Sequence, residues 1–341
     1  MTEGAGERAS LRVGLIGCGA VGTKRADALG HDALVGCFDV DPRVSNALSR
    51  RFGGLACASV DDLLAMEPDV VVVAVTHDAL ADNACHALHT GAHVLVEKPA
   101  GIGVADVDRI AETAEAVGRL VKVGFNHRFH PAISHAVSEA ASGRFGPITH
   151  VRGRYGHGGR IGYEREWRAD RARSGGGELV DQGMHLLDLS YALLGPLPLH
   201  SALLRTAFWP MDVEDNAIVI LGERESGPWA MFHTSWTEWK NLFSLEVFCA
   251  TGKLQIDGLA GSYGEQRLVI FAMRPEMGPP DVEELTFPSD DTSWAREWAA
   301  FTEAIVAGDD RPLRGDLQSA RYGWSCIEDA YARAERGAVR A

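Results

Sequence analysis

The chain has 341 residues, of which 46% are hydrophobic, and its formal net charge is −14. This length suggests two domains, and the composition is that of a globular protein with ample apolar side chains for its cores. The acidic balance argues against nucleic acid or an anionic membrane as the main partner. The longest apolar run, Val70 to Val75, is far too short to span a bilayer.

The cysteines and the first residues bear on the compartment. Met1 to Ser10 is polar and acidic and lacks the apolar segment of a signal peptide. The six cysteines are scattered along the chain and form no CxxC pair, so we interpret them as reduced thiols. Both observations predict a cytoplasmic protein. The cysteines are residues 18, 37, 57, 85, 249 and 326.

A strand–loop–helix–strand pattern begins at Arg12. Residues 12–16 form a predicted strand, a helix follows as far as Leu29, and residues 34–38 form a second strand that ends at Asp39. The strand and helix are joined by a GxGxxG loop. Its first glycine permits a tight turn, its second lets the backbone approach a pyrophosphate, and its third lets helix pack on strand. The loop, predicted to bind a dinucleotide, is Gly17-Cys18-Gly19-Ala20-Val21-Gly22.

The carboxylate that ends the second strand bears on the choice of cofactor. Asp39 lies 17 residues after the last glycine of the loop and is placed to accept hydrogen bonds from a ribose diol. A carboxylate there repels a 2′-phosphate, which favours NAD over NADP. Arg43 is close enough in sequence to weaken that argument, so NADP stays open.

The alternation of strands and helices continues as far as Gly124. Short apolar strands separated by helices specify a parallel, doubly wound sheet. We predict helices over 61–66, 79–89 and 104–117, and strands over 69–75, 93–96 and 120–124.

One of these strands runs directly into Glu97-Lys98-Pro99. In open α/β sheets, ligands bind beyond the carboxyl ends of the strands. Lys98 therefore lies where a catalytic side chain is useful, although most lysines are solvated surface residues.

The pattern of the sequence changes from Ile148 onward. A helix is predicted over 131–142 and is followed by longer strands with few helices between them, which indicates a large, open, mostly antiparallel sheet in an α+β domain. The predicted strands are 148–155, 199–208, 216–221, 229–237, 243–250, 252–257 and 267–271. Residues 294–307 and 317–336 are predicted to form two helices that close the domain, with Trp294 and Trp298 in a core.

An unusual helix start lies inside this second part. After Gly175-Gly176-Gly177, an apolar helix carries Asp181 and His185 at a spacing that places them on one face, and Asp188 one turn later. A structural network of satisfied polar side chains is one explanation, and a catalytic group is the other.

These motifs together resemble the Gfo/Idh/MocA family, which includes glucose–fructose oxidoreductase and inositol dehydrogenase. The resemblance extends from about Leu11 to the last helix. The residues that carry it are the glycine loop, Glu97-Lys98-Pro99, Gly124-Phe125-Asn126-His127-Arg128-Phe129 and the segment from Asp181 to Asp188. It implies a dinucleotide-binding Rossmann domain over 1–127 and a substrate-binding and oligomerisation domain over 128–341, whose last helices could pack back on the first.

The resemblance also implies roles for single residues. In family members the residues matching Lys98 and His185 serve the chemistry, and the one matching Asp181 helps to hold the substrate. The lysine–proline bond is often cis, so we expect this of Pro99. Some relatives carry tyrosine in place of His185, and many carry arginine or another residue in place of His127. A homodimer or homotetramer paired through the open sheet is implied as well.

A basic, glycine-rich segment precedes the Asp/His helix. Residues 152–177 hold seven arginines against Glu164, Glu166 and Asp170, a local balance of +4. Arginine forks on phosphate or carboxylate would suit a sugar phosphate, nucleotide sugar or sugar acid, whereas a surface arm or subunit contact is the alternative. Trp236 and Lys240 form a second polar and aromatic cluster that could stack on a sugar, although a tryptophan in a core explains it too.

We therefore hypothesise an NAD(P)-dependent oxidoreductase that moves a hydride between nicotinamide and a secondary alcohol of a sugar or cyclitol. His185 is the expected general base, Lys98 the cation at the developing oxyanion, and Asp181 the group that holds a neighbouring hydroxyl or orients His185. The alternatives are a non-catalytic nucleotide-binding sensor of the same fold and an enzyme with a tightly held, recycled cofactor. No metal site is expected, because two ligands do not complete a set.

The expected site residues fall into two sets. For the cofactor they are the glycine loop 17–22, Asp39, Val40, Arg43, Thr76, His77, Glu97, Lys98, Pro99 and Asn126. For the substrate they are Lys98, His127, Arg128, Arg160, Arg168, Asp181, His185, Trp236 and Lys240.

Overall fold

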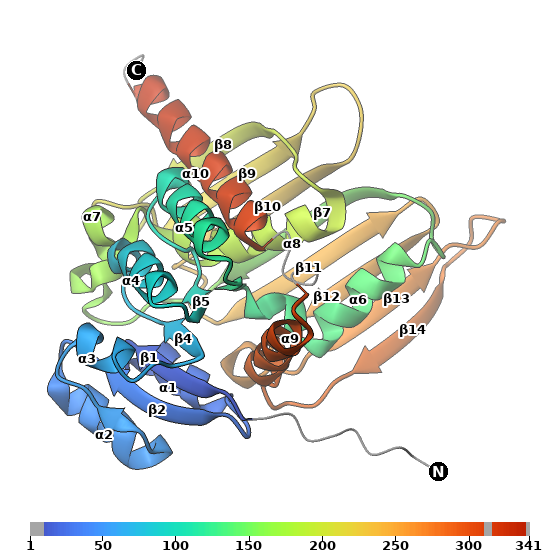
Figure 1. The fold of residues 1–341 in the computed structure, drawn as a ribbon. Helices are drawn as coiled ribbons and strands as arrows, with labels where there is room; N and C mark the ends of the chain where they lie inside the picture. Colours follow the sequence, from blue (N-terminus) through green and yellow to red (C-terminus); the bar gives the residue numbers. More distant parts are fainter. Residues whose placement is uncertain (1–9, 310–315, 339–341) are drawn as a thin grey trace, which may run out of the picture. The chain divides into compact units, whose positions relative to one another are not determined.

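The computed structural model describes residues 10–309 and 316–338 (Figure 1). Of the segment Met1–Ser10, on which the signal-peptide expectation rests, only Ser10 lies among these residues. The chain divides into two compact units. The first contains the described residues up to Ala100, Ala105–Gly124 and the described part of Trp294–Leu317. The second contains Gly101–Val104, Phe125–Ser293 and the described residues from Gln318 onward.

The first unit is built on a six-stranded sheet in which every neighbouring pair is parallel. This confirms the predicted doubly wound sheet. The strand order is β3-β2-β1-β4-β5-β6, so the direction of winding reverses between β1 and β4, where such folds bind ligands. The strands are β1 (Arg12–Ile16), β2 (Ala33–Phe38), β3 (Leu55–Ala56), β4 (Val70–Val73), β5 (His93–Glu97) and β6 (Val121–Gly124).

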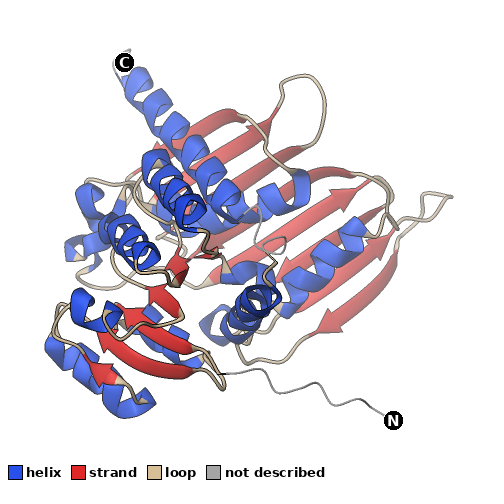
Figure 2. Cartoon of the chain, in the orientation of Figure 1, coloured by secondary structure: helices blue, strands red, loops and turns tan. Residues whose placement is uncertain are grey.

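The helices that connect these strands pack against the sheet (Figure 2). One of them, α2, is absent from the sequence prediction. It begins after Asp41, whose carboxylate caps the backbone N–H of Arg43, and Pro42 occupies its first turn, where proline is favoured. The helices are α1 (Ala20–Asp27), α2 (Pro42–Phe52), α3 (Val60–Leu64), α4 (His77–His89) and α5 (Val104–Val117).

Helix α9 (Ser293–Ala307), late in the chain, belongs to the first unit from Trp294 onward. The indole of Trp298 donates a hydrogen bond to Asp32 at 2.9 Å, and its ring packs in the same core as Val13 and Leu95. Trp298 is thus a core residue, as predicted. Trp294 is only half-buried, and the guanidinium of Arg25 lies 4.5 Å from its ring centroid.

The second unit is built on an eight-stranded sheet of order β14-β13-β12-β11-β7-β10-β9-β8. All its neighbouring pairs are antiparallel except β7 and β10, which agrees with the predicted mostly antiparallel sheet. The prediction missed β14, a charged and exposed edge strand. The strands are β7 (Ile148–Gly156), β8 (Leu199–Arg205), β9 (Asn216–Gly222), β10 (Trp229–Ser235), β11 (Leu242–Cys249), β12 (Gly252–Asp257), β13 (Arg267–Ala272) and β14 (Asp281–Thr286).

Helices cover one face of this sheet. Helix α6 (Pro131–Ala141) packs on β12 and β13, and α8 (Met184–Leu194) packs on β7 (Figure 1). Strand β11 accordingly alternates buried and half-buried residues along its whole length. On the less buried face, the His150 ring lies between Trp229 and Phe248, with ring centroids 4.5 Å and 4.1 Å away. The last helix, α10, spans Asp316–Ala338.

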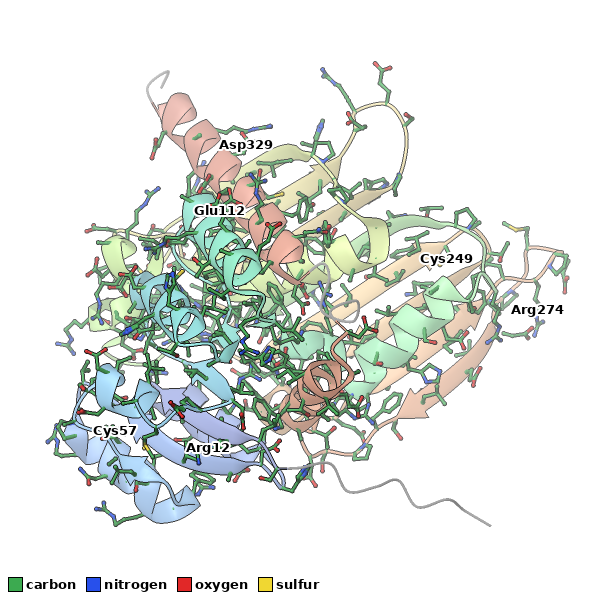
Figure 3. All side chains as sticks on the ribbon, viewed as in Figure 1. Arg12, Cys57, Glu112, Cys249, Arg274 and Asp329 are labelled. Carbon is green, nitrogen blue, oxygen red and sulfur yellow. The ribbon has the colours of Figure 1, made fainter. Side chains whose placement is uncertain are left out.

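All six cysteines are free and buried. They are spread over both units, with Cys57 in the first and Cys249 in the second (Figure 3). Among the described residues, no helix combines the length and the apolar character needed to cross a membrane.

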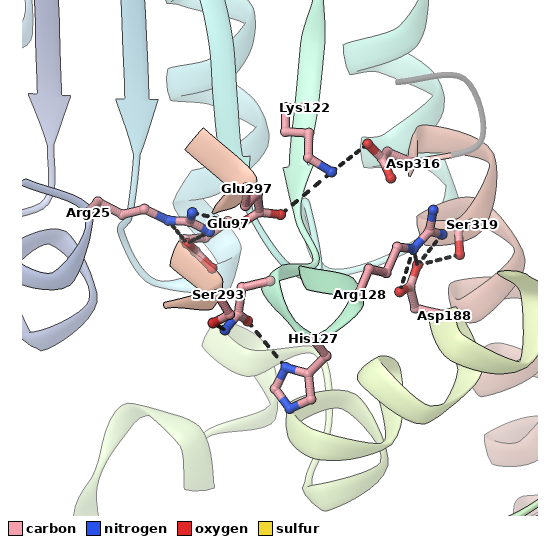
Figure 4. A network of polar contacts seen from close by, with 11 residues as sticks. Arg25, Glu97, Lys122, His127, Arg128, Asp188, Ser293, Glu297, Asp316 and Ser319 are labelled. Carbon is pink, nitrogen blue, oxygen red and sulfur yellow. Dashed lines mark hydrogen bonds and ion pairs between the residues drawn. The ribbon is translucent and has the colours of Figure 1, made fainter. Parts of the chain in front are cut away.

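A buried network of charges joins five elements of the first unit (Figure 4). The Arg25 guanidinium donates to Glu97 at 2.6 Å and to Glu297 at 2.7 Å. The Lys122 ammonium lies 3.5 Å from Glu297 and donates to Asp316 at 2.7 Å. Burial opposes the charge of Arg25, but the two glutamates raise the pKa of its guanidinium above the ordinary value. The network therefore fixes Glu97, the residue immediately before Lys98.

We predict that Glu297→Ala destabilises the first unit, because it leaves the buried cations of Arg25 and Lys122 short of a partner. Loss of one member of a buried ion pair costs roughly 3–5 kcal/mol of unfolding free energy. Urea unfolding followed by tryptophan fluorescence measures this loss. The control is Arg109→Ala, which removes an exposed ion pair with Asp82 and should change stability little. Equal effects of the two substitutions would show that the network is not structural.

Candidate functional site

The glycine loop has the geometry expected of a dinucleotide loop. Gly17 has φ +93°, and a Cβ there would lie 2.3 Å from the carbonyl oxygen of Ala74. A Cβ on Gly22 would lie 2.0 Å from the carbonyl oxygen of Gly17, so both positions exclude other residues. By contrast, a Cβ on Gly19 would meet nothing within 4 Å. Gly19 thus caps α1 beside open space, where the helix N-terminus suits a pyrophosphate.

Asp39 ties the end of β2 to this loop. Its carboxylate accepts hydrogen bonds from the backbone N–H of Cys18 at 2.8 Å and of Asp41 at 2.9 Å. It also lines a cleft of about 550 Å³ together with Val40, Ser45 and Ala58. The cleft lies where β2 and β3 end, which is the position expected for the ribose and base of a dinucleotide.

Arg43 is engaged by a neighbouring carboxylate. Its guanidinium donates to Asp41 at 2.7 Å and 3.0 Å. The exposed Asp41 carboxylate raises the pKa of Arg43, and Arg43 lowers the pKa of Asp41. Because Asp41 holds this guanidinium, the structure offers less support for a 2′-phosphate contact than the sequence spacing alone suggested.

The other predicted cofactor residues of the first unit lie at the ends of β4 and β5. Thr76 is the residue before α4, and His77 begins that helix and is buried. At the end of β5 the Lys98–Pro99 peptide bond is cis, as predicted from the resemblance. Glu97, which precedes this bond, is held by Arg25 through the buried network (Figure 4).

Asp181 and His185 belong to the second unit, but the helix that carries them is not regular. Residues Leu179–Gly183 form a π-helical turn, η4, and α8 begins at Met184. A π-turn holds more residues than an α-helical turn, so the regular helix predicted through Asp181 begins only at Met184. Such turns occur frequently at functional sites.

Buried side chains hold the start of this helix. The Glu214 carboxylate accepts the backbone N–H of Leu179 at 3.0 Å and of Gly177 at 3.3 Å, as well as the Tyr331 hydroxyl at 2.9 Å. A Cβ on Gly177 would lie 2.0 Å from the Glu214 carbonyl oxygen, and one on Gly176 would lie 1.9 Å from the Tyr331 hydroxyl. The glycines before the helix are therefore required by close packing.

Asp188 has a structural role. It accepts three hydrogen bonds from Arg128, at 2.6–3.1 Å, and one from the Ser319 hydroxyl at 2.8 Å (Figure 4). Arg128 was predicted to bind substrate, but the structure places its guanidinium on this buried carboxylate. The bidentate geometry is that of a strong charge-assisted pair.

Asp181 faces Arg168. The two side chains approach to 3.3 Å, and the Arg168 guanidinium lies 4.5 Å from the Trp167 ring centroid. Burial opposes the charge of Arg168, but Asp181 raises the pKa of that guanidinium. Asp181 therefore has a cationic neighbour within ion-pair distance.

His185 lies against the ring of His127. The two imidazoles are stacked with centroids 3.7 Å apart and an angle of 22° between their planes. The Tyr155 ring centroid is 6.1 Å from that of His185, and burial raises the pKa of the Tyr155 hydroxyl well above its usual value. Tyr155 was not predicted. The sequence feature that could have indicated it is its place at the end of the predicted strand 148–155, within the basic segment.

Two further residues complete the polar surroundings of this histidine pair. Asn126, a predicted cofactor ligand, has its amide oxygen 3.2 Å from the Nδ1 atom of His127. Gln182 donates a hydrogen bond to the Tyr263 hydroxyl at 2.9 Å, and burial raises the pKa of that hydroxyl. The second unit therefore gathers Asp181, His185 and His127 from the predicted set.

The basic segment is largely neutralised by ion pairs. Five of its seven arginines lie within 4.0 Å of a carboxylate. Arg160 is one of them, since it donates to Glu166 at 2.7 Å. The pairs are Arg152–Glu246, Arg160–Glu166, Arg165–Glu164, Arg168–Asp181 and Arg171–Glu335. Most of the guanidiniums in this segment therefore already have a carboxylate partner.

The second predicted cluster is not open to a sugar ring either. Trp236 is completely buried in a core with Tyr163, Trp209 and Val213. Its ring faces are covered, so the prediction that it stacks on substrate is wrong and the core interpretation is correct. Lys240 is exposed. Among the residues described, no three His, Cys, Asp or Glu side chains form a group suited to a metal ion.

Family models match both units of the chain. A model described as "Oxidoreductase family, NAD-binding Rossmann fold" matches residues 11–125, and one described as "GFO/IDH/MocA C-terminal domain" matches residues 134–255. The chain belongs to the Gfo/Idh/MocA oxidoreductase family. Its N-terminal part is an NAD-binding Rossmann domain.

Individual relatives match over shorter stretches. Glucose-6-phosphate 3-dehydrogenase of Bacillus subtilis is 27% identical over 187 residues, which are 53% of each chain. Inositol 2-dehydrogenase of Acidothermus cellulolyticus is 36% identical over 148 residues, 40% of this chain and 42% of that protein. The matches thus span about half the length of these curated relatives or less. A crystal structure of GenD2 from gentamicin A biosynthesis, in complex with NAD, has the same fold, with a TM-score of 0.83 at 24% identity over 99% of this chain and 97% of that one.

We predict that Gly19→Ala weakens NAD binding without unfolding the protein. The new methyl group meets no protein atom, but it stands where the pyrophosphate should approach the backbone. We expect the Kd for NAD, measured by calorimetry, to rise at least about tenfold, which corresponds to about 1.4 kcal/mol.

The matched control is Gly17→Ala. Its Cβ would clash with the Ala74 backbone at a position of positive φ, so this variant should lose thermal stability. If Gly19→Ala binds NAD as tightly as the wild type, the pyrophosphate does not lie against this loop.

Proposed function

We propose that the protein is an NAD-dependent dehydrogenase that acts on a secondary alcohol of a sugar or cyclitol. The observation that carries the proposal is the combination of an NAD-binding Rossmann domain with Lys98, Asp181 and His185. The named activities of its relatives, on glucose 6-phosphate and on inositol, support that substrate class.

The chain fits the cofactor that this reaction needs. The open space beside Gly19, the exposed N-terminus of α1 and the cleft lined by Asp39 suit a pyrophosphate and a ribose. NAD, when bound, supplies the hydride acceptor at nicotinamide C4. Asp39 next to the cleft and the pairing of Arg43 with Asp41 favour NAD over NADP.

In the proposed reaction His185 accepts the proton of the reacting hydroxyl. An imidazole can accept and release a proton in the neutral pH range, which suits this role. The Lys98 ammonium stabilises the negative charge that develops on the same oxygen, and it is supplied by a strand end that the buried network holds. Asp181, with Arg168 beside it, accepts a hydrogen bond from a neighbouring hydroxyl of the substrate.

The ion pairs of the arginines bear on whether the substrate is charged. An anion bound by Arg160 or Arg168 would have to displace Glu166 or Asp181 from its guanidinium. We therefore propose an uncharged sugar or cyclitol as the substrate. A sugar phosphate, nucleotide sugar or sugar acid is the alternative, supported by the named substrate of the Bacillus subtilis relative.

Incubation with NAD⁺ and a panel of sugars and cyclitols should produce NADH. We expect kcat/KM to be higher for an uncharged sugar than for its own phosphate, since five of the seven arginines of the basic segment are already paired. The same panel with NADP⁺ compares the two cofactors. A preference for the phosphate would contradict the uncharged substrate and leave the dehydrogenase intact, whereas no NADH with any compound would favour the non-catalytic sensor.

Replacing the proposed chemical groups should abolish turnover without abolishing the fold. We expect His185→Ala to lower kcat by roughly 10²–10⁴, the usual contribution of a general base. Lys98→Met should cause a loss of similar order, because it removes the cation that faces the developing oxyanion.

The control for both variants is His200→Ala, at an exposed position on β8, which should keep the wild-type rate. Circular dichroism and thermal melting establish that each variant is folded. Near-normal rates for both His185→Ala and Lys98→Met would show that the assigned roles are wrong.

A further inference from the structure

We infer that His127 is a positioning residue that fixes the ring of His185. This rests on the proposed function of His185 as the general base. The argument has three steps: the contact between the two rings, the anchoring of His127, and the packing that surrounds it.

The contact between the rings is face to face. With centroids 3.7 Å apart and planes 22° from parallel, the π-faces touch, and both side chains are buried. The N–H groups of an imidazole lie in the plane of its ring, so stacked rings cannot hydrogen-bond to each other. His127 therefore passes no proton directly to His185 in this arrangement. It acts on its neighbour by limiting how that ring can turn.

His127 is itself anchored by a chain of hydrogen bonds (Figure 4). Its Nδ1 atom lies 3.2 Å from the amide oxygen of Asn126. The Asn126 amide nitrogen donates to the Ser293 hydroxyl at 2.9 Å, and that hydroxyl donates to Asp291 at 2.6 Å. Asn126 and Ser293 are both buried, whereas Asp291, at the end of this hydrogen-bond chain, is exposed.

Three further rings enclose His127. His130 and Phe243 meet it nearly edge to face, with centroids 5.4 Å and 6.0 Å away, and Tyr155 is tilted against it at 5.2 Å. A ring bounded on these sides and tied through Nδ1 has little freedom to rotate about χ2. Because the His185 ring is stacked on His127, its rotation is restricted as well on the face that His127 covers.

The restriction matters because a general base works only at hydrogen-bond distance from the proton it accepts. A misplacement of about 1 Å can cost around 100-fold in rate. Phe125 and Tyr155 flank His185 at 6.4 Å and 6.1 Å, too far to replace a stacked neighbour. Removal of the His127 ring should therefore let His185 adopt unproductive rotamers.

The decisive comparison is between His127→Ala and His127→Phe. Alanine removes the stacked face, whereas phenylalanine keeps a ring of similar size and loses the nitrogen. We expect His127→Ala to lower kcat on the order of 10- to 100-fold with KM within a few-fold of wild type. The kcat of His127→Phe should stay close to that of the wild type.

A second variant tests the anchor from a distance. Ser293→Ala removes the hydroxyl that holds Asn126, and Ser293 belongs to neither the proposed catalytic set nor the predicted cofactor set. We expect a smaller fall in kcat than for His127→Ala. Equal loss in His127→Ala and His127→Phe would assign chemistry to the imidazole and overturn the positioning role, as would unchanged kcat in His127→Ala.

A spectroscopic measurement keeps this test independent of activity. Ring protons above a stacked aromatic face resonate at unusually high field, and the His185 signals can be assigned from the spectrum of His185→Ala. We expect these protons to lose their upfield shift in His127→Ala and to retain it in His127→Phe. If the shift is unaltered in His127→Ala, the stack is absent and the inference fails, even where the dehydrogenase activity is confirmed. If no activity is found with any substrate, the proposed function fails while the stack can still be observed.

Discussion

Buried carboxylates hold the two chain segments from which the proposed chemistry arises. In the first unit, Glu97 is bound by Arg25 and lies next to Lys98. In the second, Glu214 holds the backbone at the start of the helix that carries His185, and Asp188 ties the following turn to Arg128 and Ser319. A carboxyl group in a protein interior is tolerated only when its oxygens are satisfied by hydrogen-bond donors. Each carboxylate therefore has a single acceptable position, and the backbone that carries it shares that position.

The side chains that make the end of β5 rigid are not among those proposed to contact the substrate. The residues of the buried network, Arg25, Lys122 and Glu297, have no assigned part in the chemistry. Buried ion pairs contribute little net stability compared with apolar residues of the same volume. Their value here is geometric, since a guanidinium fork fixes both the distance and the plane of the carboxylate that it binds.

The sequence predicted the parts of the structure that depend on local pattern. The glycine loop, the valine strand β4 and the alternating strands of the second unit each follow from residue spacing, and the cis bond at Pro99 followed from family resemblance. The helix α2 had a usable signal in Asp41-Pro42 that the prediction did not weigh. What escaped prediction depends on partners distant in sequence. Two ion pairs of the basic segment reach the distant carboxylates of Glu246 and Glu335, and the stack on His185 comes from a residue 58 positions earlier. The π-turn at Leu179–Gly183 is set by Glu214 and Tyr331, which no local pattern around the turn reveals.

The membership of α9 in the first unit has a consequence for how this protein can be dissected. The first unit is assembled from segments that are separated by almost the whole of the second, and Trp298 and Phe301 fill a core whose other walls come from the beginning of the chain. A fragment cut after the sixth strand would expose the apolar side chains that these residues cover, and Asp32 would lose its indole donor. The nucleotide-binding unit is thus not expected to fold as a fragment that ends after the sixth strand. Its completion waits for the last part of the polypeptide, so a ribosome must make nearly all of the chain before the first core can close.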